Sequence, residues 1–235
     1  MLAQQASDLF GITLSPEQVE QFDVYARELA AWNAHTNLTA ITEPDAVRVR
    51  HFLDSLSIVR AVGFTPGQRV IDVGTGAGLP GLALHIAYPF LRTTLLEATG
   101  KKITFLDHMI STLGLTGVNT AHARAEEGGQ NPGLRAKFDV VLARAVARLP
   151  ALLEYLVPFA KVGGVCVAMK GATAEQEAVD SALALATLGA ELREIIPIRL
   201  PGVDDTHYLV VVQKTAKTPS TYPRKPGVPT RKPLE

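Results

Sequence analysis

The chain has 235 residues, which is enough for one sizeable hydrophobic core and a smaller appended piece. Hydrophobic residues make up 47% and charged residues 20%, a balance that excludes intrinsic disorder, and the formal net charge of zero requires any nucleic-acid-binding surface to be local. One cysteine, Cys166, lies in an apolar run, and no segment has the pattern of a signal peptide or a membrane span, so we expect a buried thiol in a cytoplasmic protein.

Residues 1–66 are predicted to form a helical cap on the rest of the chain. Ser15, Pro16 and Gln18 supply an N-cap, a proline at the first helical position and a capping-box side chain. Apolar residues then recur at helical spacing, which predicts one buried stripe, until a polar loop over 32–39 ends the helix.

A second helix of this cap is predicted to begin near Thr42 and to carry His51 and Asp54. These two side chains are three residues apart, so they share one helical face. The pattern fits a solvated pair as well as a functional site.

The glycine-rich stretch over residues 69–81 is predicted to organise the rest of the chain. It begins with a β-branched strand over 69–73, continues with alternate glycines, and leads into a helix over about 79–88. Glycine allows positive φ and lets a ligand approach the backbone without meeting a Cβ atom. The pattern is therefore typical of a nucleotide-binding turn between a strand and a helix.

Two ligand classes fit this turn. Residues 76–81 match the G-x-G-x-x-G pattern of dinucleotide-binding proteins. Residues 72–78 have an acid followed by G-x-G-x-G, which resembles the first motif of class I S-adenosylmethionine-dependent methyltransferases. Asp72 favours the second class, because its carboxylate would repel the pyrophosphate of a dinucleotide. A plain structural turn without a ligand is the remaining alternative.

Strands and helices alternate from residue 67 to residue 213, which predicts an α/β domain with a doubly wound parallel sheet. The further strands are predicted at 92–97, 118–121, 138–143, 163–169, 191–198 and 207–213, and the further helices at 100–114, 150–160 and 174–188. Glu97 ends the second strand, where either ligand class would use an acid on ribose hydroxyls. The last two strands are joined by a loop too short for a crossover, so they should form an antiparallel hairpin, as methyltransferases do.

The segment 214–235 is predicted to be a basic, proline-rich C-terminal tail. Its prolines argue against a helix or a central strand, so it should be extended. It is either a disordered solubilising segment or a basic strap along a polyanion. In the second case, truncation at Lys214 should weaken RNA association and leave cofactor affinity intact.

Charged residues lie at the predicted carboxyl ends of the strands, where doubly wound sheets bind ligands. Arg144 and Lys170 follow two of these strands, and Lys101, Lys102 and Arg124 lie near the same rim, so an anionic acceptor is expected.

The sequence lacks the tetrapeptide of amino-group methyltransferases and a second cysteine for pyrimidine carbon methylation. Guanine N7 needs neither, because its lone pair is free and transfer requires positioning rather than a general base. Such a guanine would have to lie in a loop or be turned out of its stack.

Several segments spread along the chain share one family resemblance. They are residues 37–41, 51–56, 72–81, 101–106, 124–127, 144–147, 170–171 and 222–229. Together they resemble the bacterial 16S ribosomal RNA guanine-N7 methyltransferase family, also known as glucose-inhibited division protein B or RsmG. The resemblance implies S-adenosylmethionine as cofactor, and guanine 527 of 16S rRNA in a small-subunit particle as substrate. It also implies a monomer without a metal, without membrane attachment and without a general acid or base.

The resemblance further implies roles for individual residues. The cofactor contacts fall on Gly74, Leu79, Glu97, Ala98, Thr99, Ala125, Glu126 and Arg144, the last at the boundary between donor and acceptor. The residues assigned to RNA or to pocket architecture are His51, Asp54, Lys170, Arg224 and Lys225. Many members have Ser, Phe and Asp where this chain has Thr75, Leu79 and Glu97, and the longer Glu97 alters the expected detail of the ribose contact. The alternative functions are a dinucleotide-dependent oxidoreductase and a non-enzymatic RNA-binding assembly factor.

Overall fold

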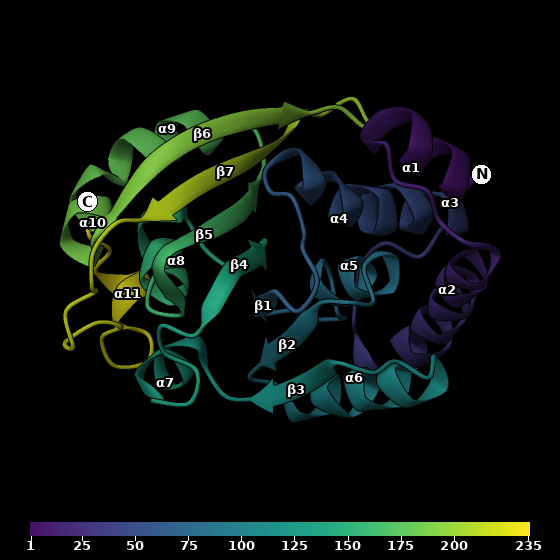
Figure 1. Ribbon diagram of the computed structural model, residues 1–235, viewed down its shortest axis with the longest axis horizontal. Coiled ribbons are helices and arrows are strands. Elements are labelled where there is room, and N and C mark those ends of the chain that lie inside the picture. Colours follow the sequence, from purple (N-terminus) through teal and green to yellow (C-terminus); the bar gives the residue numbers. More distant parts are fainter.

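The predicted strands form one mixed sheet of seven strands in the computed structural model, which describes residues 1–235 (Figure 1). The strands are β1 (Arg69–Val73), β2 (Arg92–Glu97), β3 (Val118–His122), β4 (Phe138–Arg144), β5 (Ala160–Lys170), β6 (Ala190–Ile198) and β7 (His207–Lys214). They lie in the order β3-β2-β1-β4-β5-β7-β6, and every pair is parallel except β5–β7 and β6–β7. The doubly wound sheet and its final hairpin are therefore confirmed.

Helices cover both faces of the sheet (Figure 1). One face carries α1 (Leu2–Phe10), α2 (Pro16–Thr36), α5 (Gly81–Ala87) and α6 (Gly100–Thr112), and the other carries α7 (Ala125–Gln130), α8 (Leu149–Leu156), α9 (Ala174–Asp180) and α10 (Ala182–Leu188). A separate hydrophobic core fills each interface, with Phe105 in the larger core and Phe159 in the smaller one. None of the helices is long and apolar enough to cross a membrane.

The N-terminal cap is helical, as predicted, and packs on α5 and α6. The capping box of Ser15 and Gln18 is formed at the start of α2. Phe22, Tyr25 and Leu29 make the buried stripe of this helix. The additional helix α1 precedes it, and the sequence pattern did not indicate that helix separately.

The second part of the cap is a helical run whose hydrogen-bond period changes along its length. It comprises α3 (Pro44–Val47), a π-helical segment (Arg48–Leu53), α4 (Asp54–Leu56) and a 3-10 turn (Ser57–Arg60). Such π segments inside helices frequently occur at functional sites. His51 and Asp54, which this run carries, are 6% and 3% exposed, so the solvated-pair alternative is wrong.

The helix expected over 174–188 is interrupted. The hydroxyl of Ser181 donates to the carbonyl of Glu177 at 2.6 Å, so that α9 ends and α10 begins at this residue. A serine that bonds back to the preceding turn competes with the regular helical ladder, which explains the break.

The C-terminal tail differs from the extended segment that its prolines predicted. Lys214 still belongs to β7 and is 2% exposed, so the tail begins one residue later. Near its end the tail forms α11 (Val228–Arg231). Pro229 is compatible with this helix, because a proline in the first turn removes an N–H that has no helical partner.

Candidate functional site

The turn after β1 is fixed by a buried carboxylate. Gly74 and Gly76 have φ of 69° and 62°, values that favour glycine. Asp72 is 0% exposed and accepts hydrogen bonds from the Thr75 hydroxyl (2.5 Å) and the Gly81 amide (2.8 Å). Burial raises the pKa of Asp72 to about 6 despite these bonds. Asp72 therefore holds the turn in shape and has no exposed surface to offer a ligand.

A pocket of about 280 Å³ adjoins this turn, and we name it the turn pocket. Its walls come from the ends of β1 and β2, the segments after β3 and β4, α8, and the C-terminal tail. The residues of its lining that the sequence assigned to a cofactor are Gly74, Glu97, Ala98, Ala125 and Glu126. The fold thus brings together residues from three separate loops.

Glu97 is the most firmly held polar group of the turn pocket. Its two carboxylate oxygens accept hydrogen bonds from the amides of Gly76 (3.0 Å) and Thr99 (2.8 Å). These donors fix its orientation and leave lone pairs for a hydroxyl donor. Thr99 therefore acts through Glu97 and does not line the pocket itself. Leu79 is also outside the lining, because it is buried in the larger core.

The exposed backbone of Gly74 forms part of the pocket wall. A Cβ atom at Gly74 would lie 3.0 Å from Cγ2 of Val146, which belongs to the segment after β4. Any side chain at Gly74 would therefore occupy space between the turn and that segment. A nucleoside with free ribose hydroxyls fits this arrangement, because Glu97 offers an oriented acceptor and the turn offers bare backbone.

A second pocket, of about 440 Å³, surrounds Arg144, and we name it the Arg144 pocket. Arg144 ends β4, and Val146, two residues later, lines the turn pocket, so the segment 144–146 lies between the two. The other walls come from the π segment, the end of β5 and the start of β7. β7 contributes because it runs antiparallel to β5, which brings its first residues beside the carboxyl end of β5.

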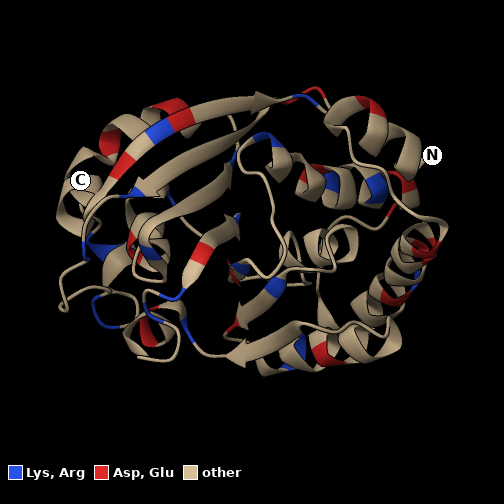
Figure 2. Ribbon diagram, in the orientation of Figure 1, with Lys and Arg blue, Asp and Glu red and all other residues tan.

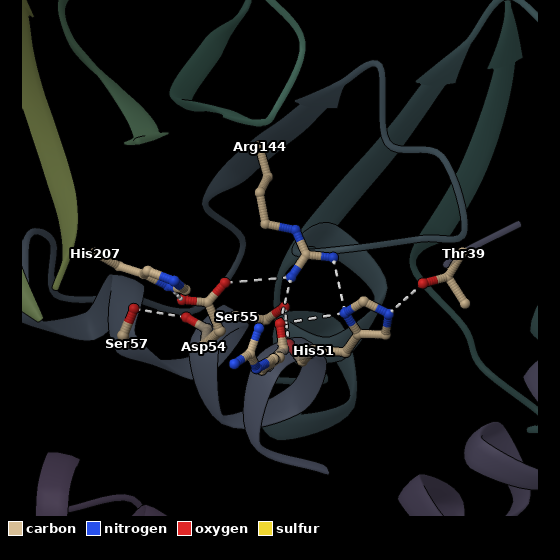
Figure 3. Close-up of polar contacts among 8 residues, drawn as sticks. Thr39, His51, Asp54, Ser55, Ser57, Arg144 and His207 are labelled. Carbon is tan, nitrogen blue, oxygen red and sulfur yellow. Dashed lines mark hydrogen bonds and ion pairs between the residues drawn. The ribbon is translucent and has the colours of Figure 1, made fainter. Parts of the chain in front are cut away.

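The Arg144 guanidinium is held by the N-terminal cap (Figure 3). It donates to the Arg50 carbonyl (3.1 Å) and to Oδ2 of Asp54 (3.3 Å), and it lies 3.5 Å from Nδ1 of His51. The other oxygen of Asp54 lies 2.9 Å from Nδ1 of His207. Asp54, which is buried, therefore joins β4 to β7 through two charged or polar contacts.

The two histidines of this network have pKa values shifted in opposite directions. The hydrogen bond with Asp54 raises the pKa of His207. Burial, and then the positive charge of Arg144, lower the pKa of His51 to about 4, so its ring is neutral near pH 7. The Nε2 atom of His51 lies 2.8 Å from the Thr39 hydroxyl. His207 was not predicted as a site residue, and its one signal in the sequence is its position at the start of the hairpin strand next to the fifth strand.

The remaining residues assigned to RNA or pocket architecture have different surroundings. The Lys170 ammonium contacts Glu177 at 2.7 Å and donates to the Ala147 carbonyl at 2.8 Å. Lys170 thus supports the wall of the Arg144 pocket. Arg224 pairs with Glu154, which is 0% exposed. Lys225 is exposed, so it alone among these three cations lies free on the surface.

Tyr25 links the N-terminal cap to the glycine turn. It is fully buried, and its hydroxyl donates to the carbonyl of Ala77. A Cβ atom at Gly78 would lie only 2.7 Å from this hydroxyl oxygen, so glycine is required where helix and turn meet. From its helical spacing Tyr25 is expected only as a member of the buried stripe of α2, although a buried tyrosine hydroxyl in such a stripe needs a partner.

The fold and the turn pocket define a class I S-adenosylmethionine-dependent methyltransferase. Solved structures with the same fold include a SAM dependent methyltransferase from Aquifex aeolicus, with a TM-score of 0.54 and 16% identity over 72% of this chain and 93% of that chain. Another is TrmN from Thermus thermophilus, with a TM-score of 0.54 and 18% identity over 71% of this chain and 53% of that chain. At these identities the likeness shows the fold alone.

The chain belongs to the GidB family, described as rRNA small subunit methyltransferase G, whose family model matches residues 18–199. A relative of that name from Desulfitobacterium hafniense is 44% identical over 234 residues, which is 100% of this chain and 97% of the relative. Another from Leuconostoc mesenteroides is 46% identical over 226 residues, covering 95% and 94%. The expected family is thereby confirmed, as is an enzyme that uses S-adenosylmethionine, and the oxidoreductase alternative is excluded.

Proposed function

We propose that the protein methylates N7 of guanine 527 in 16S rRNA, acting as a monomer on a small-subunit particle in the cytoplasm. The observation that supports this most is the meeting of two pockets at residues 144–146, one suited to a nucleoside and one centred on an arginine. The relatives are named for ribosomal RNA of the small subunit, which agrees with this substrate.

The turn pocket would hold the cofactor, which supplies an electrophilic methyl group on a sulfonium. Glu97 would accept hydrogen bonds from the ribose hydroxyls, since its carboxylate is already oriented by two amides. Gly74 would give the ligand close access to the backbone. Ala125 and Glu126, which begin α7, would border the adenine.

The Arg144 pocket would take the guanine. Most of its ionisable side chains are engaged with one another, because Asp54 contacts Arg144 and His207 while Lys170 contacts Glu177. None of them needs to remove a proton, since the N7 lone pair is free. The network would therefore hold the guanidinium and the pocket walls in a fixed geometry, and the rate enhancement would come from positioning in line with the donor.

The RNA surface would be local rather than spread over the molecule. Figure 2 shows Lys and Arg distributed over many helices and strands and mixed with Asp and Glu. Arg50 is exposed and lines the Arg144 pocket, so it offers a cation to a phosphate beside the bound guanine.

The test is methyl transfer from labelled S-adenosylmethionine to small subunits that lack the modification, with the labelled nucleoside identified after digestion. We expect label only in 7-methylguanosine, at one site. Subunits that already carry the modification are the control and should take up no label. Label in another nucleoside would contradict the N7 assignment, and equal labelling of free 16S rRNA would contradict the need for a particle.

A further inference from the structure

The C-terminal strap, defined as residues Thr215–Glu235, is docked on the face formed by α7, α8 and α10. The Thr218 hydroxyl donates to the carbonyl of Leu188 at 2.8 Å. The Arg135 guanidinium donates to the strap carbonyls of Thr218 (3.1 Å) and Tyr222 (2.7 Å). These bonds come from the folded domain, so the strap is a structural element and not a free tail.

The middle of the strap is anchored by an ion pair with a buried carboxylate. The Arg224 amide and its Nη2 atom each lie 2.6 Å from an oxygen of Glu154, a fully buried residue of α8. The hydrogen bond with Glu154 raises the pKa of Arg224. Pro223 packs so closely on α7 that a Cβ atom at Gly129 would lie 2.8 Å from it. The charge of Arg224 is therefore compensated by Glu154, although its side chain is still 24% exposed.

The end of the strap reaches the turn pocket. Gly227 and Thr230 are part of the pocket lining. The Gly227 amide donates to Oε1 of Glu126 at 2.8 Å, and the Thr230 hydroxyl lies 2.7 Å from the hydroxyl of Tyr155, another lining residue. Glu126 is 7% exposed, so the strap takes one of its oxygens and helps to set its orientation.

We propose that residues 227–231 of the strap form part of the S-adenosylmethionine site. They would orient Glu126 and, through the Thr230–Tyr155 contact, close the adenine side of the turn pocket. The ligand class is an adenine nucleoside carrying free ribose hydroxyls. This inference rests on the cofactor lying in the turn pocket, as proposed above. It reverses the expectation from the basic composition of the tail. Loss of the strap should lower the affinity for the cofactor more than the affinity for RNA.

The test compares binding of S-adenosylmethionine and S-adenosylhomocysteine by calorimetry in the full chain and in variants. Deletion of residues 227–235 keeps the Arg224–Glu154 pair, and circular dichroism and ligand-free thermal unfolding check its fold. We expect this deletion to raise the Kd of both ligands about tenfold, by the same factor because they share the nucleoside. Thr230→Val should raise both Kd values about fivefold, the effect of one lost hydrogen bond.

Thr218→Val is the matched control. It removes a strap hydrogen bond of 2.8 Å, close to the 2.7 Å contact of Thr230, but Thr218 is not in the pocket lining. It should lower the unfolding temperature and leave both Kd values unchanged. A Kd raised equally by Thr218→Val and Thr230→Val would mean that the strap acts through general stability, which overturns the inference.

Two further outcomes separate this inference from the proposed function. If the deletion variant is folded and binds both ligands as the full chain does, the strap is not part of the site, although the cofactor assignment stands. If the deletion variant does not fold, an unchanged Kd in Thr230→Val would likewise show that the strap is not part of the site. If the full chain binds neither ligand, the assignment of the cofactor to this chain fails and the inference fails with it. Lost methylation of rRNA at saturating cofactor, with unchanged Kd, would assign the strap to RNA instead.

Discussion

The two pockets on either side of residues 144–146 differ in what forms them, which is mainly backbone in the turn pocket and mainly side chains in the Arg144 pocket. The backbone of the glycine turn forms part of the wall of the turn pocket. Two backbone amides hold the carboxylate of Glu97 in place there. The Arg144 pocket depends on side chains from three distant segments, with Asp54 between Arg144 and His207. The first pocket is therefore vulnerable to added atoms, and the second to a removed charge.

This difference has a functional side. The glycine turn is held by Asp72, whose pKa burial raises to about 6, so the turn pocket depends on one buried carboxyl that responds to acid. The network around Arg144 contains two histidines with shifted pKa values, so its stability follows pH. Substitutions should therefore separate cofactor binding from catalysis on rRNA, whereas acid should act on both pockets.

Gly74→Val is expected to have the largest effect. A branched side chain would adopt the φ of 69° with strain and would fill the space before Val146. Affinity for S-adenosylmethionine, measured by calorimetry, should fall by about 100-fold or more, equivalent to about 2.7 kcal/mol.

Gly114→Val is the control for that substitution. Gly114 has a similar φ of 62°, but nothing lies within 4 Å of a Cβ atom there. This variant should lose about 1–2 kcal/mol of stability through backbone strain and keep its cofactor affinity. An equal loss of affinity in both variants would mean that strain, and not obstruction of the pocket, is the cause.

Asp54→Asn should have the next largest effect, and on the other pocket. The amide has the same size but lacks the charge that holds Arg144, so kcat/KM for rRNA should fall about 30-fold, or about 2 kcal/mol, with cofactor affinity unchanged. Breaking this buried pair should also destabilise the protein by about 3 kcal/mol. The comparison is Asp45→Asn. The carboxylate of Asp45 pairs with Arg48 but is 84% exposed, so the pair should contribute less than about 0.5 kcal/mol to stability. A weaker cofactor Kd in Asp54→Asn would show that the two pockets are coupled.

The stability of the protein should depend on pH through two histidines, His51 and His207, whose contributions change with pH in opposite directions. The folded pKa of His51 is about 4, below its ordinary 6.5, so its stabilising contribution is present above pH 6.5 and lost as pH falls toward 4. Relative to His51→Gln, the protein should lose about 2 kcal/mol between pH 7 and pH 5 in denaturant unfolding.

His207 should show the reverse dependence. Its pKa is raised, so its contribution is fully present below the unfolded value and disappears as pH rises through the folded value. His207→Gln should therefore cost more stability at pH 5 than at pH 8. Asp72, whose pKa is about 6, titrates in the same window but is common to all these proteins, so differences between variants remove it. If the difference in unfolding free energy between each variant and the unsubstituted protein does not vary with pH, the shifted pKa values of both histidines are wrong.

Tyr25→Phe should have the smallest effect. It removes the hydroxyl that donates to the buried carbonyl of Ala77, which should cost about 1 kcal/mol in thermal unfolding. Because this carbonyl belongs to the glycine turn, cofactor affinity should fall only about two- to threefold. Unchanged stability would mean that water replaces the hydroxyl.

The sequence predicted the sheet and the inner wall of the turn pocket because both follow from local patterns. A β-branched strand, alternate glycines and an acid ending the next strand are all read within about thirty residues. The short loop before His207 was enough to indicate the hairpin. Glu97 could be identified for the same reason, since strand order alone brings it to the turn.

The rest depends on contacts between residues far apart in the sequence. Asp54 and His207 are separated by 153 positions, and Arg224 and Glu154 by 70. Neither separation leaves a local pattern. One signal was available, because Glu154 is the lone acid in the apolar helix α8, and a buried carboxylate requires a cation. That requirement predicts a cation beside Glu154, but only the fold shows that it is Arg224 of the tail.

Every strand of the sheet precedes the strap in the chain, so no strand pairing depends on residues 227–231. A chain with its strap undocked keeps the glycine turn and Glu97, but Glu126 and Glu154 lack their strap partners. Because Glu154 is fully buried, leaving its carboxylate without Arg224 lowers the stability of the domain. Docking of the strap therefore couples completion of the cofactor site to the stability of the helices beneath it.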